Sequence, residues 1–211
     1  MSDLIKPARF RTLLILGAPG SGKGTQGKVL GSVPRFHHLA CGDVFRSLDT
    51  RTPLGQKFVE YSSRGELVPD DVTVQLWHAN VKQRVDAHAF KPEIDFLVLD
   101  GIPRNVEQAQ HMEQHIEVVK VFHLSCPNRS ELARRLRKRA LKDNRFDDAN
   151  ESVIQNRFAT YDAETKPILD YYGSDRVIEI DASQAPAKVL YDILGGVMRL
   201  EEWKEIEKMK I

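Results

Sequence analysis

The chain has 211 residues and a formal net charge of +1, with 41% hydrophobic and 29% charged residues. These values are ordinary for a globular protein with a substantial core, and they exclude a disordered chain. The balanced charge also excludes an overall attraction to nucleic acid, so partners must be inferred from individual sites.

The cysteines and the N-terminal segment bear on the compartment. The two cysteines, Cys41 and Cys126, lack C-x-x-C spacing, so neither a disulfide framework nor a zinc cluster is indicated. Residues 1–11 carry charges but no apolar segment of signal length, and no stretch approaches ~18 apolar residues. We therefore expect a cytoplasmic protein with reduced thiols and with neither a membrane partner nor a nucleic-acid partner.

The first predicted strand, residues 12–16, leads through a glycine-rich loop into a predicted helix at residues 24–30. The loop contains Gly17, Gly20, Ser21, Gly22, Lys23, Gly24 and Thr25. Its glycines allow a backbone that approaches an oxyanion closely, while the first helix amides and the lysine supply positive charge. A plain strand-to-helix turn would need fewer glycines, so the pattern predicts a nucleotide phosphate site. The hydroxyl of Thr25 comes one residue later than in the common G-x-x-x-x-G-K-[ST] pattern.

Short apolar runs then alternate with longer stretches of helical character. We expect further strands at residues 36–39, 96–99, 118–124 and 177–180. We expect helices from residue 43 onward and at residues 70–86, 106–114, 130–142, 151–172 and 185–200. This alternation predicts an α/β fold in which helices cover both faces of a parallel sheet.

Three segments fall outside that alternation. Residues 43–86 form a helical insertion and residues 143–150 a short polar connection, and both are candidates for moving parts. In the tail at residues 201–211, Trp203, Ile206 and Met209 recur about every third residue. We expect a helix end packed on the body there, with partner binding as the weaker alternative.

Asp100 follows the predicted strand at residues 96–99, so it lies at the sheet edge where the glycine-rich loop also ends. A carboxylate there can hold a magnesium ion directly or through its waters, and the alternative is an acidic helix cap. Arg104 emerges from the next turn, beside this carboxylate.

Several arginines point to the type of reaction. Arg135 and Arg139 lie four residues apart on one helix, Arg145 lies in the polar connection, and Arg157 lies in the helix that follows. Phosphoryl transfer needs positive charge around the transferring group, and arginine supplies it in planar, permanently charged form. Other basic residues crowd the same helix, so a solvated charged face is also possible, and spacing alone leaves both interpretations open.

The sequence is similar to nucleoside monophosphate kinases, and most similar to the short-lid adenylate kinases, over residues 13–198. The motifs that carry the resemblance are GAPGSGKGTQ at 17–26, CGDVFR at 41–46, RGELVPDDV at 64–72, LDGIPRNVEQ at 99–108, RRLRKR at 134–139, NRFDDANESVIQNRFATY at 144–161 and IDAS at 180–183.

The resemblance implies one P-loop kinase domain built on five parallel strands. Its core would comprise residues 1–40, 76–138 and 151–211, with an acceptor-binding insertion at 41–75 and a short lid at 139–150. The implied activity is reversible, magnesium-dependent transfer of the ATP γ-phosphoryl group to AMP, giving two ADP. We expect a monomer that binds ATP, AMP and ADP.

The resemblance also implies roles for individual residues. The catalytic residues would be Lys23, Arg104, Arg135, Arg139, Arg145 and Arg157. ATP would contact Gly20, Ser21, Gly22, Lys23, Gly24, Thr25 and Arg135. AMP would contact Cys41, Arg46, Glu66, Val68, Gly101, Arg104, Gln108, Arg145 and Arg157. Asp100 would organise Mg²⁺ through its waters, and Asp147 and Asp148 match acids of similar lids.

Two departures from the adenylate kinase pattern concern the acceptor base. Cys41 stands where a threonine is common, and Ile102 replaces a more frequent aromatic residue. Gln108 matches the glutamine that recognises adenine, whereas UMP and CMP kinases of similar architecture tend to carry asparagine there. AMP is therefore the expected acceptor, and a UMP/CMP kinase is the alternative. A non-catalytic nucleotide switch is disfavoured because the N-K-x-D-like segment is missing and Asp100 and the arginines are retained.

Overall fold

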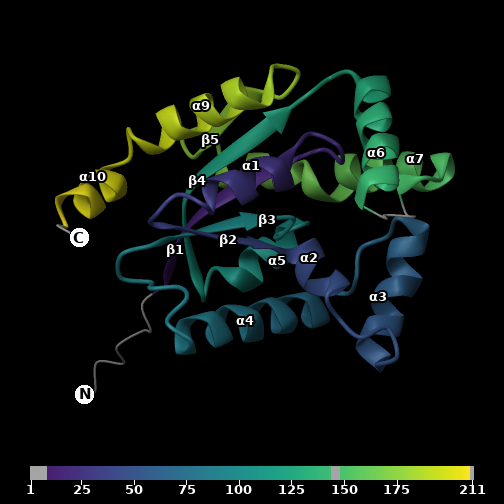
Figure 1. Ribbon diagram of the computed structural model, residues 1–211, viewed down its shortest axis with the longest axis horizontal. Coiled ribbons are helices and arrows are strands. Elements are labelled where there is room, and N and C mark those ends of the chain that lie inside the picture. Colours follow the sequence, from purple (N-terminus) through teal and green to yellow (C-terminus); the bar gives the residue numbers. More distant parts are fainter. Residues whose placement is uncertain (1–8, 144–147, 210–211) are drawn as a thin grey trace.

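Five parallel strands form the centre of the computed structural model, which describes residues 9–143 and 148–209 (Figure 1). The strands are β1 (Phe10–Gly17), β2 (Phe36–Ala40), β3 (Phe96–Asp100), β4 (Ile116–Ser125) and β5 (Val177–Asp181), in the spatial order β2-β3-β1-β4-β5. Every neighbouring pair is parallel, and Ile15 of β1 lies opposite Asp100 of β3. The predicted α/β fold is confirmed, including the loop that follows the first strand.

Helices cover both faces of this sheet, as the alternation of strands and helices predicts. They are α1 (Lys23–Leu30), α2 (Cys41–Arg46), α3 (Pro53–Arg64), α4 (Asp70–Asp86), α5 (Val106–Met112), α6 (Arg129–Asp143), α7 (Glu151–Thr160), α8 (Pro167–Tyr172), α9 (Pro186–Val197) and α10 (Glu201–Lys208). In Figure 1, α9 lies above the sheet and α4 below it. None of the helices within residues 9–143 and 148–209 is both long and apolar enough to cross a membrane.

The core consists of two apolar clusters, one on each face of the sheet. Side chains of β1 alternate between them, because successive residues of a strand point to opposite faces. Leu13 and Ile15 belong to the cluster that also includes residues of α1, α6 and α9. Leu14 and Leu16 belong to the cluster with residues of α2, α4, α5 and α8. Burial on both faces explains why these strands are nearly continuous apolar runs.

The helical stretch predicted at residues 151–172 is present, but it is not a single regular α-helix. A wide π-helical turn, η2 (Tyr161–Thr165), separates α7 from α8, and Lys166 N donates to Tyr161 O at 2.9 Å. Pro167 explains the change, since it lacks an N–H and its ring crowds the preceding turn of a regular helix. Elsewhere the helix bounds differ by a few residues, and α2 begins at Cys41 rather than at Asp43.

The C-terminal tail packs on the body, as expected. Trp203 of α10 stacks on Phe36 with ring centroids 5.1 Å apart, and Ile206 is buried. Met209, the third residue of the pattern, is exposed. These contacts account for the apolar spacing of the tail without a partner protein.

Candidate active site

The loop between β1 and α1 depends on its glycines. Gly17, Gly20 and Gly22 have φ values of 152°, 83° and 99°, which other residues rarely adopt. A Cβ on Gly17 would lie 2.6 Å from the carbonyl oxygen of Leu124, and one on Gly20 would lie 2.7 Å from that of Leu132. Glycine is therefore required both for the loop conformation and for its packing against β4 and α6.

Lys23, the first residue of α1, folds back over this loop. Its half-buried side chain donates from Nζ to the carbonyl oxygens of Gly17 at 2.7 Å and Ala18 at 3.2 Å. Burial lowers the pKa of this ammonium group to about 8, although Asp100 favours the charged form. Nearby positive charges lower the pKa of Lys23 further, and they belong to Arg139, Arg104 and Arg157. Such a concentration of cations around a loop of backbone amides is suited to a polyanion.

Asp100 at the end of β3 faces the start of α1. It is 8% exposed, and a Cβ on Gly24 would lie 3.3 Å from its Oδ2. Glycine at this position therefore keeps the space in front of the carboxylate open. Nearby, the hydroxyl of Ser21 is buried and has no hydrogen-bond partner within residues 9–143 and 148–209, whereas Thr25 is exposed. An open carboxylate and an unpaired buried hydroxyl fit a hydrated cation beside a bound phosphate.

Asp148 joins two of the predicted catalytic arginines. Arg139 Nε donates to Asp148 Oδ2 at 2.7 Å, and Arg157 Nη1 donates to Asp148 Oδ1. The Asp148 side chain is fully buried, while the two arginine side chains are 31% and 21% exposed. By contrast, Arg134 and Arg137 are more than half exposed and pair with surface acids. The basic helix thus has one solvated face and one inward face, and Arg139 lies on the inward one.

Arg135 and Arg145 are not part of this pair. Arg135 donates from Nε to Glu131 Oε1 and from Nη1 to the carbonyl oxygen of Ala182, both at 2.9 Å. Its guanidinium is therefore held against the loop that follows β5. Arg145, together with Asp147, lies outside the described residues.

The turn after β3 and helix α2 carry two further predicted phosphate-binding residues, Arg104 and Arg46. Arg104 Nε donates to the Gly101 carbonyl oxygen at 2.9 Å, and Gly101 has a φ of 76°. Arg46 Nη2 donates to Asp43 Oδ1 at 2.6 Å.

The surroundings of Cys41 show that α2 and the turn after β3 lie close together. Burial raises the pKa of its thiol to about 11, and Arg104, Asp100 and Arg46 are near enough to affect it as well. The predicted acceptor residues of α2 and of the turn after β3 are therefore neighbours.

Gln108 of α5 is fully buried, and both ends of its carboxamide are hydrogen-bonded. Its Oε1 accepts from the backbone N of Arg104 at 2.9 Å, and its Nε2 donates to Asp70 Oδ1. Asp70 Oδ2 in turn accepts from Asn105 Nδ2 at 2.9 Å. Nothing in the local sequence marks Asp70 as a site residue, because an acid in the first turn of a helix is ordinarily explained by the helix dipole.

The other predicted acceptor residues border a hollow beside this network. Val68 is buried, and Glu66 forms an ion pair with Arg64 at 3.0 Å. The hollow has a volume of about 330 Å³ and is lined by Glu66, Leu67, Val68, Pro69, Asp70, Asn105, Thr160 and Glu164.

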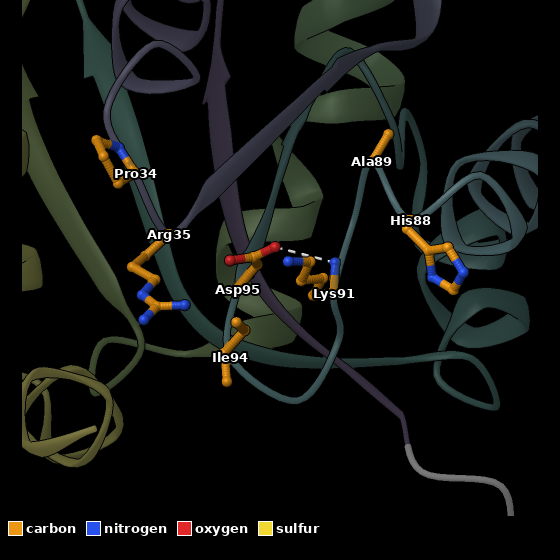
Figure 2. A pocket seen from close by; sticks show the side chains of 7 residues that line it. All are labelled: Pro34, Arg35, His88, Ala89, Lys91, Ile94 and Asp95. Carbon is orange, nitrogen blue, oxygen red and sulfur yellow. Dashed lines mark hydrogen bonds between the residues drawn. The ribbon is translucent and has the colours of Figure 1, made fainter. Parts of the chain in front are cut away.

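A second hollow, of about 350 Å³, lies at the opposite edge of the sheet, before β2 and β3 begin (Figure 2). It is lined by Pro34, Arg35, His88, Ala89, Lys91, Ile94 and Asp95. The Asp95 carboxylate accepts a hydrogen bond from the backbone N of Lys91 at 2.9 Å. Ligands of open α/β sheets bind at the carboxyl ends of the strands, so this hollow is not part of the candidate site.

A parallel sheet with a phosphate-binding loop after its first strand defines a P-loop protein, and the three arginines near Lys23 indicate a phosphate-handling site. The chain belongs to the adenylate kinase family, because the family model described as "Adenylate kinase" matches residues 15–177.

Relatives named adenylate kinase support this membership over most of the chain. The protein of Cyanothece sp. is 36% identical over 196 residues, covering 90% of this chain and 96% of that protein. That of Corynebacterium diphtheriae is 39% identical over 186 residues, covering 88% and 98%. "Adenylate kinase 1" of Schistosoma mansoni is 35% identical over 181 residues, covering 84% and 88%. The predicted resemblance is confirmed, and the chain is a phosphotransferase of this family.

Proposed function

We propose that this protein transfers the γ-phosphoryl group of ATP reversibly to AMP, giving two ADP, as a cytoplasmic monomer that acts on free nucleotides. The observation that carries the proposal is the environment of Lys23. Its ammonium lies at the phosphate loop with a carboxylate and three arginines close enough to affect its pKa. One of these, Arg104, lies in the turn after β3, so predicted ATP-binding and AMP-binding residues lie near one another.

ATP would lie with its phosphates on the loop after β1. The backbone amides there and the Lys23 ammonium would bind the β- and γ-phosphates, as helix N-termini and lysines do in P-loop proteins. Arg135, held against the loop after β5, would contact the ATP side from α6. The loop residues proposed to contact ATP are Gly20, Ser21, Gly22, Lys23, Gly24 and Thr25.

AMP would lie across the site, with its phosphate between Arg46 and Arg104. Guanidinium groups bind phosphate through paired, charge-assisted hydrogen bonds. Gln108 would recognise the base. The remaining contacts would come from Cys41, Glu66, Val68, Gly101, Arg145 and Arg157.

The reaction needs position and positive charge more than acid–base catalysis. A phosphate oxygen of AMP attacks the γ-phosphorus of ATP, the bond from that phosphorus to the β–γ bridging oxygen breaks, and its electron pair leaves with ADP. Arg139 and Arg157, placed together by Asp148, stabilise the charge on the transferring group. Closure of the insertion at 41–75 and of the lid at 139–150 would exclude water, which otherwise competes as the acceptor.

We also propose that Mg²⁺ accompanies the ATP phosphates. The residues present fit this ion, because Gly24 leaves the space before Asp100 open. Asp100 would hold it through its waters. A bound Mg²⁺ supplies positive charge that neutralises the β- and γ-phosphate oxygens.

The test is a coupled assay of ADP formation with ATP and each of AMP, CMP and UMP. We expect kcat/KM to fall in the order AMP, CMP, UMP. Equal efficiency with CMP or UMP would favour the UMP/CMP kinase. Nucleotide binding without transfer to any of the three would favour the non-catalytic switch.

A further inference from the structure

We propose that Asp70 is a positioning residue that sets the donor and acceptor order of the Gln108 carboxamide and thereby selects an aminopurine over an oxopurine. The inference rests on the proposed function, because it concerns the base of the acceptor monophosphate. The carboxamide of Gln108 is hydrogen-bonded at both ends. Arg104 N donates to Gln108 Oε1 at 2.9 Å, and Gln108 Nε2 donates to an Asp70 carboxylate oxygen.

These two neighbours admit only one orientation of the amide. A backbone N–H can only donate, and an ionised carboxylate can only accept. Turning the carboxamide of Gln108 by 180° would place its NH₂ against the N–H of Arg104 and its oxygen against the Asp70 carboxylate. Since Gln108 is 0% exposed, water cannot relieve either mismatch. Asp70 and the Arg104 backbone therefore fix which end of the amide is the donor.

Each end of the carboxamide keeps one unused hydrogen-bonding position, which a base would reach by displacing the groups that cover Gln108 in the ligand-free protein. An amide oxygen has two acceptor positions and an amide NH₂ has two protons. Arg104 and Asp70 use one of each. What remains is one acceptor beside one donor. This order matches a base edge with an amino group next to an unprotonated ring nitrogen, as in adenine, and mismatches a carbonyl next to a ring N–H, as in hypoxanthine.

Asp70 is itself held in place from a second helix. Its other carboxylate oxygen accepts from Asn105 Nδ2 at 2.9 Å. The side-chain oxygen of Asn105 accepts from Gln108 N at 2.7 Å and so caps α5. Asp70 is itself the first residue of α4. The donor order of Gln108 is thus set jointly by α4 and α5.

The experiment compares AMP with inosine monophosphate (IMP) as acceptors, because the two have bases of the same size and differ in this edge. The variant is Asp70→Asn, which keeps the shape but allows either end of its own amide to face Gln108. The matched control is Asp71→Asn, which removes the same charge from the next, exposed residue of the helix. We expect Asp70→Asn to reduce the AMP/IMP ratio of kcat/KM about tenfold or more, with KM for ATP unchanged. Asp71→Asn should keep the wild-type ratio.

A purely structural role of Asp70 would lower the rates with AMP and IMP by the same factor. That result, or an unchanged AMP/IMP ratio, overturns the inference and leaves the proposed function standing. Wild-type protein that phosphorylates neither nucleotide overturns both.

A second measurement uses the wild-type protein and is independent of how the variant folds. The side-chain amide of Gln108 should give an NMR signal, assigned by its loss in Gln108→Leu, with one downfield proton that exchanges slowly with water. Two protons that exchange as fast as those of exposed glutamines would overturn the inference.

Discussion

Lys23 and Asp100 lie close enough for the carboxylate to raise the pKa of the ammonium, yet burial outweighs it and the pKa of Lys23 falls to about 8. The ligand-free protein therefore keeps a lysine whose charge is poorly compensated. A polyanion bound at the loop would supply the missing negative charge. We therefore expect Lys23 to lower the free energy of unfolding of the ligand-free protein and to contribute to activity.

The unfavourable burial of the Lys23 charge predicts how the free energy of unfolding depends on pH. In the unfolded chain the pKa of Lys23 is near 10.5, and in the folded protein it is about 8. Between these values the unfolded chain holds a proton that the folded protein does not, so the free energy of unfolding rises with pH across this window. Below it the full cost, on the order of 3 kcal/mol, is present.

Lys23→Met should therefore raise the free energy of unfolding of the ligand-free protein at pH 7 while reducing phosphoryl transfer about 100-fold or more. Urea unfolding of both proteins across pH 7–11 measures the first effect, and the difference between them should shrink above pH 8. A folded variant with near wild-type kcat would contradict the catalytic role. A variant less stable than wild type at pH 7 would contradict the unfavourable burial.

Arg46→Ala and Arg104→Ala should weaken the acceptor monophosphate much more than ATP. A charge-assisted hydrogen bond to phosphate contributes about 1.5 to 3 kcal/mol, so KM for AMP should rise about tenfold or more. Arg51→Ala is the control, because its side chain is 89% exposed and pairs with a neighbouring surface acid. Steady-state titration of ATP and of AMP measures the two KM values. Equal changes in KM for ATP and AMP would show that these arginines do not specifically bind the AMP phosphate.

Asp148→Asn should lower both kcat and stability. It removes the buried charge that holds Arg139 and Arg157 together, so the arginines lose their common position and two charge-assisted hydrogen bonds are weakened. We expect a loss of about 1 to 3 kcal/mol in urea unfolding, because both arginines remain partly solvated. Glu151→Gln, which breaks the exposed pair with Arg137, should leave the unfolding midpoint unchanged. Equal effects of the two substitutions would argue against a special role of Asp148.

Gln108→Leu should erase most of the preference for AMP over UMP. The carboxamide can accept from the adenine amino group and donate to the adjacent ring nitrogen, whereas uracil presents the opposite order. A buried polar group left unpaired costs about 1 to 3 kcal/mol, so wild type should prefer AMP about tenfold or more in kcat/KM. The matched control is Gln110→Leu, an exposed glutamine on the same helix. If Gln108→Leu retains the wild-type AMP/UMP ratio, the base is recognised elsewhere.

Some features of this protein follow from local sequence alone. The phosphate loop is one, because its positive φ angles need glycine whatever surrounds them. The helix at Asp70–Asp86 is another, since it follows Pro69 and carries two acids in its first turn. The buried strands are further examples, because short continuous apolar runs are typical of strands covered on both faces. The family motifs predicted the roles of individual arginines, such as Arg139 and Arg157. The π-helical turn η2 was signalled locally by Pro167 but was not predicted.

Other features depend on contacts between residues distant in sequence. Spacing along α6 does not tell which arginines face inward, and this was decided by Asp148 and by the Ala182 carbonyl oxygen, 47 residues from Arg135. Asp70 resembles an ordinary first-turn acid until the fold brings it to Gln108, 38 residues away. The physical reason is that a local pattern fixes the backbone conformation of a segment, whereas the partner of a buried polar group depends on how the separate segments pack together.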